Sequence, residues 1–183
     1  MTVIPHAASA NESADAPIRL VAYDLEWPAM FEQECAVLEQ TLAQWLTGPL
    51  EHIGSTAVPG LLAKPVIDIM GGVASLDASR DAVAGAGKAG YIYYPYRADQ
   101  MHWFCKPSAE LRTHHLHLVP VGSPLWVERL AFRDYLRHTP AAACEYAELK
   151  QRLSKEFQFD REAYTDAKAP FVRHVVELAL KGV

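Results

Sequence analysis

A single carboxylate interrupts an apolar segment near the middle of the chain, VIDIM at residues 66–70. Alternate side chains of a strand point to opposite faces, so Ile67 and Ile69 would share one face and Asp68 would lie on the other. A carboxylate is buried in such a strand only with a cation, hydrogen-bond donors or a metal ion as its partner. We therefore expect Asp68 to face a functional site, with a structural ion pair as the alternative.

A loop rich in hydrogen-bond donors precedes this strand. Residues 50–54 predict a short strand that ends at Gly54, where the absence of a side chain lets a ligand approach the backbone. Ser55 and Thr56 follow with hydroxyl groups, and Lys64 adds a point charge suited to phosphate later in the loop. These residues predict a phosphate-binding loop. An ordinary turn with a solvent-exposed lysine is the alternative.

Two histidines alternate with two leucines further along the chain. Leu116 and Leu118 would enter the core from one face of a strand, while His115 and His117 would project side by side from the other. Such a pair suits a metal site or a general base. Our hypothesis is that Asp68, His115 and His117 form one catalytic and metal-binding site, which requires that their strands lie together.

The C-terminal third of the chain is rich in cations. Tyr164 and Lys168 are four residues apart and would share a face of a helix. Together with Arg133, they are candidates for holding a phosphate tail. For most of the cations in this third, including Lys150, a solvated surface position is the alternative.

The order of the predicted elements indicates the fold class. Strands are predicted at residues 50–54, 66–70, 91–96, 101–106 and 115–119. Helices are predicted at residues 27–46, 79–89, 124–138, 141–157 and 170–181. We expect the motif Thr47-Gly48-Pro49 to end the first helix. Strands followed by helices favour an α+β fold, a mixed sheet with flanking helices and a helical C-terminal layer.

The chain has 183 residues, which is the size of one domain. We expect a disordered tail at residues 1–17, where small and polar residues dominate, and a single domain at residues 18–183. The three cysteines are widely spaced and form no zinc-finger pattern, so they predict neither disulfides nor a structural zinc site.

The net charge of −5 argues against a nucleic-acid partner, because proteins that bind duplexes usually carry a basic excess. No apolar run reaches the roughly 20 residues needed to cross a bilayer, and no secretory signal precedes residue 18. These features predict a cytoplasmic protein without a membrane partner. Its partner would be a small phosphorylated molecule.

Four motifs resemble the GrpB-like family of bacterial proteins: EHIGSTAVPGLLAKPVIDI, HHLHLVP, FRDYLRHTPAAACEYAELK and DREAYTDAK. The resemblance runs in the same order from about Ile18 to Leu180. It implies a nucleotidyltransferase fold, in which a mixed sheet carries a Gly-Ser turn and a metal-binding carboxylate. Some members are fused to dephospho-coenzyme A kinase, which implies a role in nucleotide or cofactor metabolism.

The match to the wider nucleotidyltransferase pattern is partial. Ile53-Gly54-Ser55 and Asp68-Ile69 fit that pattern, but Met70 occupies the position of its second carboxylate. Two carboxylates normally bridge the magnesium ions that neutralise a triphosphate. One aspartate with two imidazoles suits manganese or zinc better than magnesium.

Three functions therefore stay open. The first is an enzyme, as the resemblance implies, that binds a nucleoside triphosphate or similar ligand and transfers a nucleotidyl or phosphoryl group to a small acceptor. The second is a ligase-like or hydrolytic variant of the same site. The third is a nucleotide- or cofactor-binding module that has lost catalysis, which Met70 favours. We expect the enzyme.

Overall fold

The computed structural model describes residues 17–182, so the tail predicted at residues 1–17 lies outside the described residues apart from Pro17. Five helices, five strands and one short 3-10 turn make up the described part of the chain. In chain order these are α1 (Trp27–Leu42), β1 (Leu46–Ile53), the turn η1 (Ser55–Ala57), β2 (Ile67–Val73), α2 (Ala82–Lys88), β3 (Ile92–Tyr94), β4 (His102–Pro107), β5 (Arg112–Pro120), α3 (Pro124–His138), α4 (Pro140–Glu156) and α5 (Arg161–Lys181). The predicted α+β class is confirmed.

The strands form one mixed sheet in the order β1-β2-β5-β4-β3. β2 and β5 run parallel at its centre, whereas the flanking pairs are antiparallel. In the parallel pair Asp68 lies opposite His115, and Met70 lies opposite His117. The sheet therefore brings together two strands that the predicted site requires.

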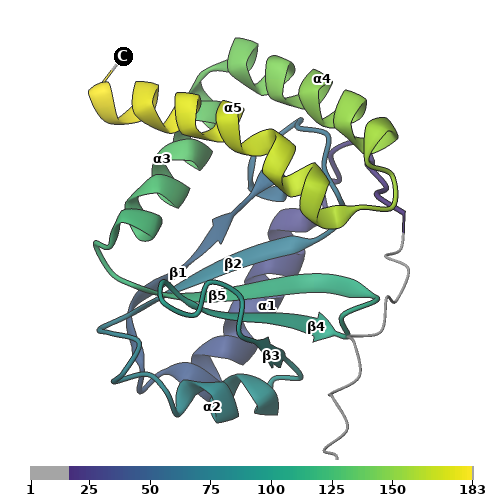
Figure 1. Cartoon of the computed structure of the whole chain (residues 1–183). Coiled ribbons are helices and arrows are strands. Elements are labelled where there is room, and N and C mark those ends of the chain that lie inside the picture. The colour runs from purple at the N-terminus through teal and green to yellow at the C-terminus, as the bar shows by residue number, and fades with distance from the viewer. Residues whose placement is uncertain (1–16, 183) are drawn as a thin grey trace, which may run out of the picture.

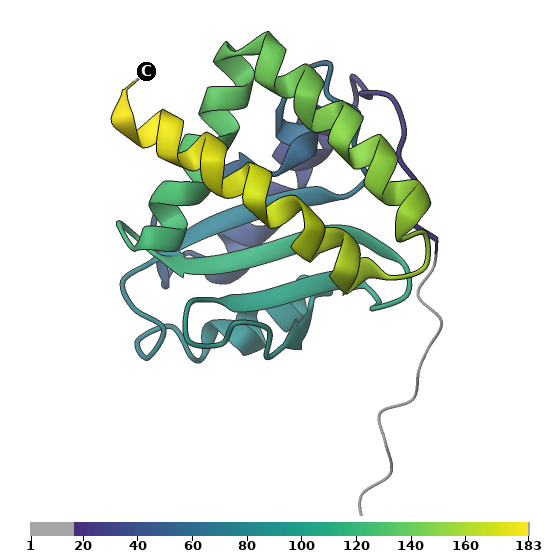
Figure 2. The ribbon, with the colours of Figure 1, turned by 45° about the horizontal axis from the view of Figure 1, so that its top comes forward.

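Helices cover both faces of this sheet. Helices α1 and α2 lie on one side and α3, α4 and α5 on the other, as Figures 1 and 2 show. Ile67 and Leu116 are buried against the α1 side. Met70 and Trp103 belong to a separate apolar cluster on the opposite face. Each face of the sheet thus has its own apolar cluster, and Asp68 projects from the same face as Met70.

The first helix ends earlier than predicted. It stops at Leu42, and the motif Thr47-Gly48-Pro49 lies inside β1 instead of terminating the helix. β1 is an edge strand, where a proline removes no hydrogen bond from the interior of the sheet. An irregular register between Leu46 and Leu50 accommodates the motif, and Thr47 donates a hydrogen bond to the Gly72 carbonyl at 3.2 Å.

The last helix begins nine residues earlier than predicted. Asp160 caps it by accepting a hydrogen bond from the Ala163 amide at 2.9 Å, and the helix then continues through Pro170. The early start places Tyr164 and Lys168 on one helix, as their spacing suggested. No helix within residues 17–182 combines the length and apolar character needed to span a membrane.

Candidate functional site

The three residues of the predicted centre lie together on the face covered by α3, α4 and α5. Asp68 projects from β2, and His115 and His117 project from the neighbouring strand β5. Asp68 Oδ1 lies 2.9 Å from His115 Nδ1 and 3.3 Å from His117 Nε2, both within hydrogen-bond distance. Parallel pairing of the two strands produces this arrangement, because it aligns side chains that are 47 and 49 residues apart.

The donor set fits a single divalent metal ion. One ligand atom from each of Asp68, His115 and His117 lies within 4.8 Å of the other two. A carboxylate with two imidazoles is a combination that zinc and manganese accept readily. Met70 is fully buried and offers only a thioether at the second acidic position. The residues therefore do not fit the pair of magnesium ions that two carboxylates would bridge.

The protonation states suit metal binding. Burial raises the pKa of Asp68, but hydrogen bonds from His115 and His117 outweigh it and hold that pKa well below its usual range. Burial also lowers the pKa of His117 to about 4, although the hydrogen bond to Asp68 opposes this. Near pH 7 the carboxylate is therefore charged and the His117 imidazole is neutral, and a metal ion at this centre would take the place of the Nε2 proton that faces Asp68.

One imidazole nitrogen in this centre has no partner. Nε2 of His115 is buried, and no hydrogen-bond partner for it occurs within residues 17–182. The His115 ring lies beside Trp103, with ring centroids 5.0 Å apart. His117 has a second contact, because its Nδ1 lies 3.4 Å from the sulfur of Met101.

Gly54 lets the loop after β1 approach the carboxylate. Its φ of +71° is in the left-handed region, and a Cβ at this position would lie 2.4 Å from Asp68 Oδ2. Thr56 is buried and donates to the Val66 carbonyl at 3.1 Å, with His52 Nε2 3.0 Å away. The Thr56 hydroxyl thus holds the loop together, while Gly54 brings its backbone to Asp68.

Lys150 anchors the same loop from helix α4. Its ammonium donates to Ser55 Oγ at 3.1 Å and to the Leu62 carbonyl. Only 2% of the residue is exposed, and burial lowers its pKa to about 7. The solvated surface position considered for Lys150 is therefore not the one it occupies. Tyr146, one helical turn earlier and also buried on α4, was a signal that this face of the helix is covered.

Lys64 and Lys168 both contact the ring of Tyr164. Their ammonium nitrogens lie 4.5 and 4.1 Å from its centroid, respectively. Burial, with repulsion from neighbouring cations, lowers the pKa of Lys64 to about 7, and burial lowers that of Lys168 to about 8. Neither lysine has a carboxylate in salt-bridge contact among the described residues. The structure thus brings these three predicted phosphate-binding residues together.

Two arginines of helix α3 have different environments. Arg133 binds the carboxylates of Glu51 and Asp134, at 2.6 and 2.7 Å, so its guanidinium is already occupied by acids. Arg129, one turn earlier, has no ion pair within residues 17–182. Burial lowers the pKa of Arg129, and Asp68 is close enough to oppose that shift. Arg129 is not among the predicted site residues, although it precedes the predicted Arg133 by four residues on the same helix.

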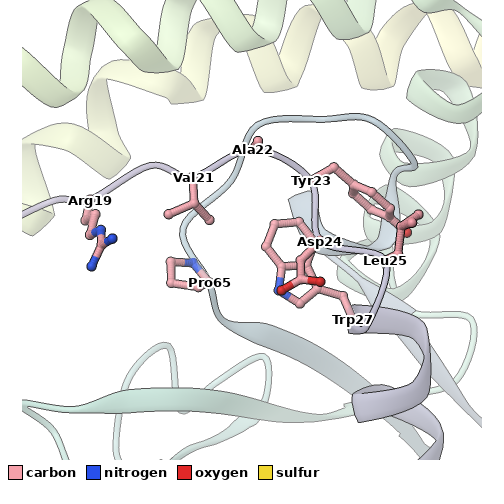
Figure 3. A pocket seen from close by; sticks show the side chains of 8 residues that line it. All are labelled: Arg19, Val21, Ala22, Tyr23, Asp24, Leu25, Trp27 and Pro65. Atoms are coloured by element: carbon pink, nitrogen blue, oxygen red, sulfur yellow. The ribbon is translucent and has the colours of Figure 1, made fainter.

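A separate hollow of about 620 Å³ lies beside the start of α1 (Figure 3). Its lining comes mainly from the segment before that helix: Arg19, Val21, Ala22, Tyr23, Asp24, Leu25, Trp27 and Pro65. It shares no residue with the centre formed by Asp68, His115 and His117. The candidate site is therefore defined by that centre and by the cations around it.

Comparisons with known proteins agree with this architecture. A family model described as GrpB protein matches residues 17–178. A UPF0157 protein of Deinococcus radiodurans is 37% identical over 156 residues, covering 85% of this chain and 79% of that protein. Glutamate-rich protein GrpB of Alkalihalophilus pseudofirmus is 33% identical over 163 residues, covering 86% and 92% of the two chains.

Two further matches concern the fold and longer relatives. A dephospho-CoA kinase of Mycolicibacterium paratuberculosis is 30% identical over 193 residues, but the match covers only 47% of that protein. The crystal structure of the conserved protein GrpB from Enterococcus faecalis superimposes with a TM-score of 0.81 at 31% identity, covering 90% of this chain and 98% of that one. The shared fold is consistent with a nucleotidyltransferase-like sheet. The matching family model and these relatives together show that the chain belongs to the GrpB family.

Proposed function

We propose that the chain binds a nucleoside triphosphate, or a similar phosphorylated ligand, and transfers a nucleotidyl or phosphoryl group to a small acceptor. The observation that carries this proposal is a charge imbalance around Asp68. Asp68 is near enough to influence three cations, Lys64, Arg129 and Lys168, and Lys168 in turn influences Lys150. Within residues 17–182 none of these four cations forms a salt bridge with a carboxylate. Unpaired cations in a desolvated region are costly, and a polyanionic ligand would offset that cost.

The residues have distinct roles in this proposal. Asp68, His115 and His117 would hold one divalent metal, manganese or zinc in preference to magnesium, whose charge would help neutralise the phosphates. Lys64 and Lys168 would bind phosphate oxygens from the α5 side. In phosphoryl transfer, positioning and charge neutralisation supply most of the rate enhancement.

The loop after β1 would shape the other side of the phosphate site. Gly54 lets this loop pack directly against Asp68, and Lys150 fixes the Ser55 hydroxyl. If Asp68 and only one of the two histidines held the metal, the other imidazole would accept the proton of the attacking hydroxyl. Arg133 is unlike the other cations because its guanidinium already binds two carboxylates.

A binding module without catalysis is the second candidate, and Met70 is the observation that favours it. The buried thioether removes the second carboxylate that a two-metal transferase would use. A hydrolytic or ligase-like reaction in the same site differs from transfer only in the acceptor. The relatives named dephospho-CoA kinase make coenzyme A a useful ligand to include in the test. We also propose that the protein is cytoplasmic.

Thermal-shift measurements with ATP, coenzyme A and divalent metals test the proposal. A ligand that binds the native state raises the melting temperature, so wild type should be stabilised by ATP together with manganese or zinc. Asp68→Asn should lose the metal-dependent part of that shift. Asp77→Asn, which changes an exposed carboxylate paired with Arg80, is the matched control and should keep it.

Catalysis is then separated from binding by measuring the release of pyrophosphate, ADP and phosphate from ATP, because nucleotidyl transfer releases pyrophosphate, phosphoryl transfer releases ADP and hydrolysis also releases phosphate. Release by wild type and its loss in Asp68→Asn support the transferase or its hydrolytic variant. Metal-dependent binding without any release supports the binding module. The same ATP-dependent shift in wild type and Asp68→Asn, with and without metal, would contradict the proposed centre.

A further inference from the structure

The loop between β3 and β4 brings an exposed aromatic ring toward the site. Tyr96 is 52% exposed, and its ring centroid lies 6.0 Å from that of Trp103. Trp103 is buried, and its ring lies 5.0 Å from that of His115. Two successive ring contacts therefore connect the exposed Tyr96 with the metal-binding candidate His115.

The loop is held in a defined conformation. Arg97 has a φ of +47°, an unusual value for a residue with a side chain, and strain of this kind often accompanies function. Its guanidinium donates to Gln100 Oε1 at 2.5 Å, and its carbonyl accepts from the Met101 amide at 3.1 Å. Met101 in turn contacts His117 through its sulfur. The loop is thus fixed at its C-terminal end to the proposed centre.

Arg129 connects this loop with the phosphate side of the site. Its guanidinium is close enough to Asp68, Arg97 and Tyr96 for each of them to influence it electrostatically. A ligand whose phosphates meet Arg129 and Lys168 would therefore extend toward Tyr96. Tyr96 there presents a flat, half-exposed ring, and a nucleotide base can stack on a ring of this kind.

We propose that Tyr96, supported from behind by Trp103, is the platform on which the base of the nucleotide stacks. The inference rests on the proposed function and specifies its ligand class, a nucleotide recognised by its base as well as by its phosphates. Stacking of a base on an aromatic side chain contributes strongly to affinity and accepts any base. Inorganic polyphosphate would bind through the cations alone and gain nothing from Tyr96.

Isothermal titration of wild type and variants with ATP and with tripolyphosphate, both with manganese present, tests the platform. Tyr96→Ala should weaken ATP binding by about tenfold, within the range measured for base stacks, and leave tripolyphosphate binding unchanged. Tyr96→Phe keeps the ring and should match wild type. Phe159→Ala removes an exposed aromatic ring at the α4–α5 turn and is the matched control, with no expected change.

The outcomes distinguish the platform from the proposed function. Unchanged ATP affinity in Tyr96→Ala would overturn the platform while the phosphate site stands. An equal loss of ATP and tripolyphosphate would also overturn it, because the loop would then shape only the phosphate site. If wild type binds neither ligand, the proposed function fails, and the platform fails with it.

Discussion

The backbone of Gly54 lies directly against the side chain of Asp68. A Cβ at position 54 would stand 2.4 Å from Asp68 Oδ2, which is too close for a real side chain, and 3.0 Å from Asp68 Cβ, which is tighter than most real contacts. The φ of +71° at Gly54 adds a second restriction, because residues with a Cβ rarely adopt it. Position 54 therefore couples the shape of the loop after β1 to the position of the carboxylate.

We expect Gly54→Ala to destabilise the protein and disturb its metal site. The backbone of Gly54, with φ of 71° and ψ of −171°, lies in a region that is essentially restricted to glycine and costs another residue about 1–3 kcal/mol. The clash with Asp68 should bring the total to about 3 kcal/mol or more. Urea unfolding measures the loss of stability, and titration with manganese should show binding at least about tenfold weaker.

Gly60→Ala is the matched control. Gly60 has a similar φ of +76°, but nothing lies within 4 Å of a Cβ placed there. This variant should therefore show only the backbone cost, about 1–2 kcal/mol, with manganese binding unchanged. Equal effects of the two substitutions would show that contact with Asp68 has no role.

Lys150→Met should lower the free energy of unfolding at pH 7 by about 1–3 kcal/mol. The substitution keeps an unbranched apolar chain but removes the donor to Ser55 and to the Leu62 carbonyl, and unsatisfied buried acceptors carry a cost of this size. Lys155→Met on the exposed side of α4 is the control, with a change within about 0.5 kcal/mol. Greater stability of Lys150→Met would mean that burying the ammonium costs more than its hydrogen bonds contribute.

The stability of the ligand-free protein should rise between pH 7 and pH 9. Lys64 and Lys150 have folded-state pKa values of about 7, and Lys168 about 8, against 10.5 for an ordinary lysine. Between these values the unfolded chain binds more protons than the folded one, so the free energy of unfolding increases with pH. We expect a rise of at least about 1 kcal/mol in urea unfolding.

The upper limit of this pH range follows from groups shifted in the opposite direction. Burial raises the pKa of Tyr146 from 10.0 and that of Cys35 from 9.0 to about 12, so above pH 9 these two groups increasingly oppose the rise. Stability should fall again only near pH 10.5, where the lysines of the unfolded chain also lose their protons. Lys64→Gln combined with Lys168→Gln should show a smaller rise from pH 7 to pH 9. Stability that falls over that range in wild type would contradict the assigned environment of the lysines.

Alternation along single strands accounts for what the sequence could predict. Ile67 and Ile69 mark one face of β2, and Leu116 and Leu118 mark the same face of β5, so Asp68, His115 and His117 emerge from the other face. The order of strands is a long-range property, and only the structure shows that β2 and β5 are neighbours. Local patterns thus predicted which residues belong to the centre, and the pairing of β2 with β5 brings those residues together.

Burial of a charged side chain is harder to predict, because the sequence of a helix does not show whether one of its lysines faces solvent or another element. Lys150 and Arg129 were missed for this reason, since their environments depend on how α3 and α4 pack over the sheet. The predicted end of the first helix at Thr47-Gly48-Pro49 was wrong for a related reason. Glycine and proline usually end helices, but here they lie in an edge strand.

The parallel pairing of β2 with β5 also bears on how the protein folds. The chain passes through α2, β3 and β4 before β5 returns to lie beside β2, so Asp68 and His115 meet only after a long stretch of chain has been ordered. Contacts between such distant segments are entropically expensive and slow to form. A ligand of this centre would find no binding partner in the early collapsed chain. Its effect on kinetics would accordingly be to delay unfolding, not to hasten the search for the native state.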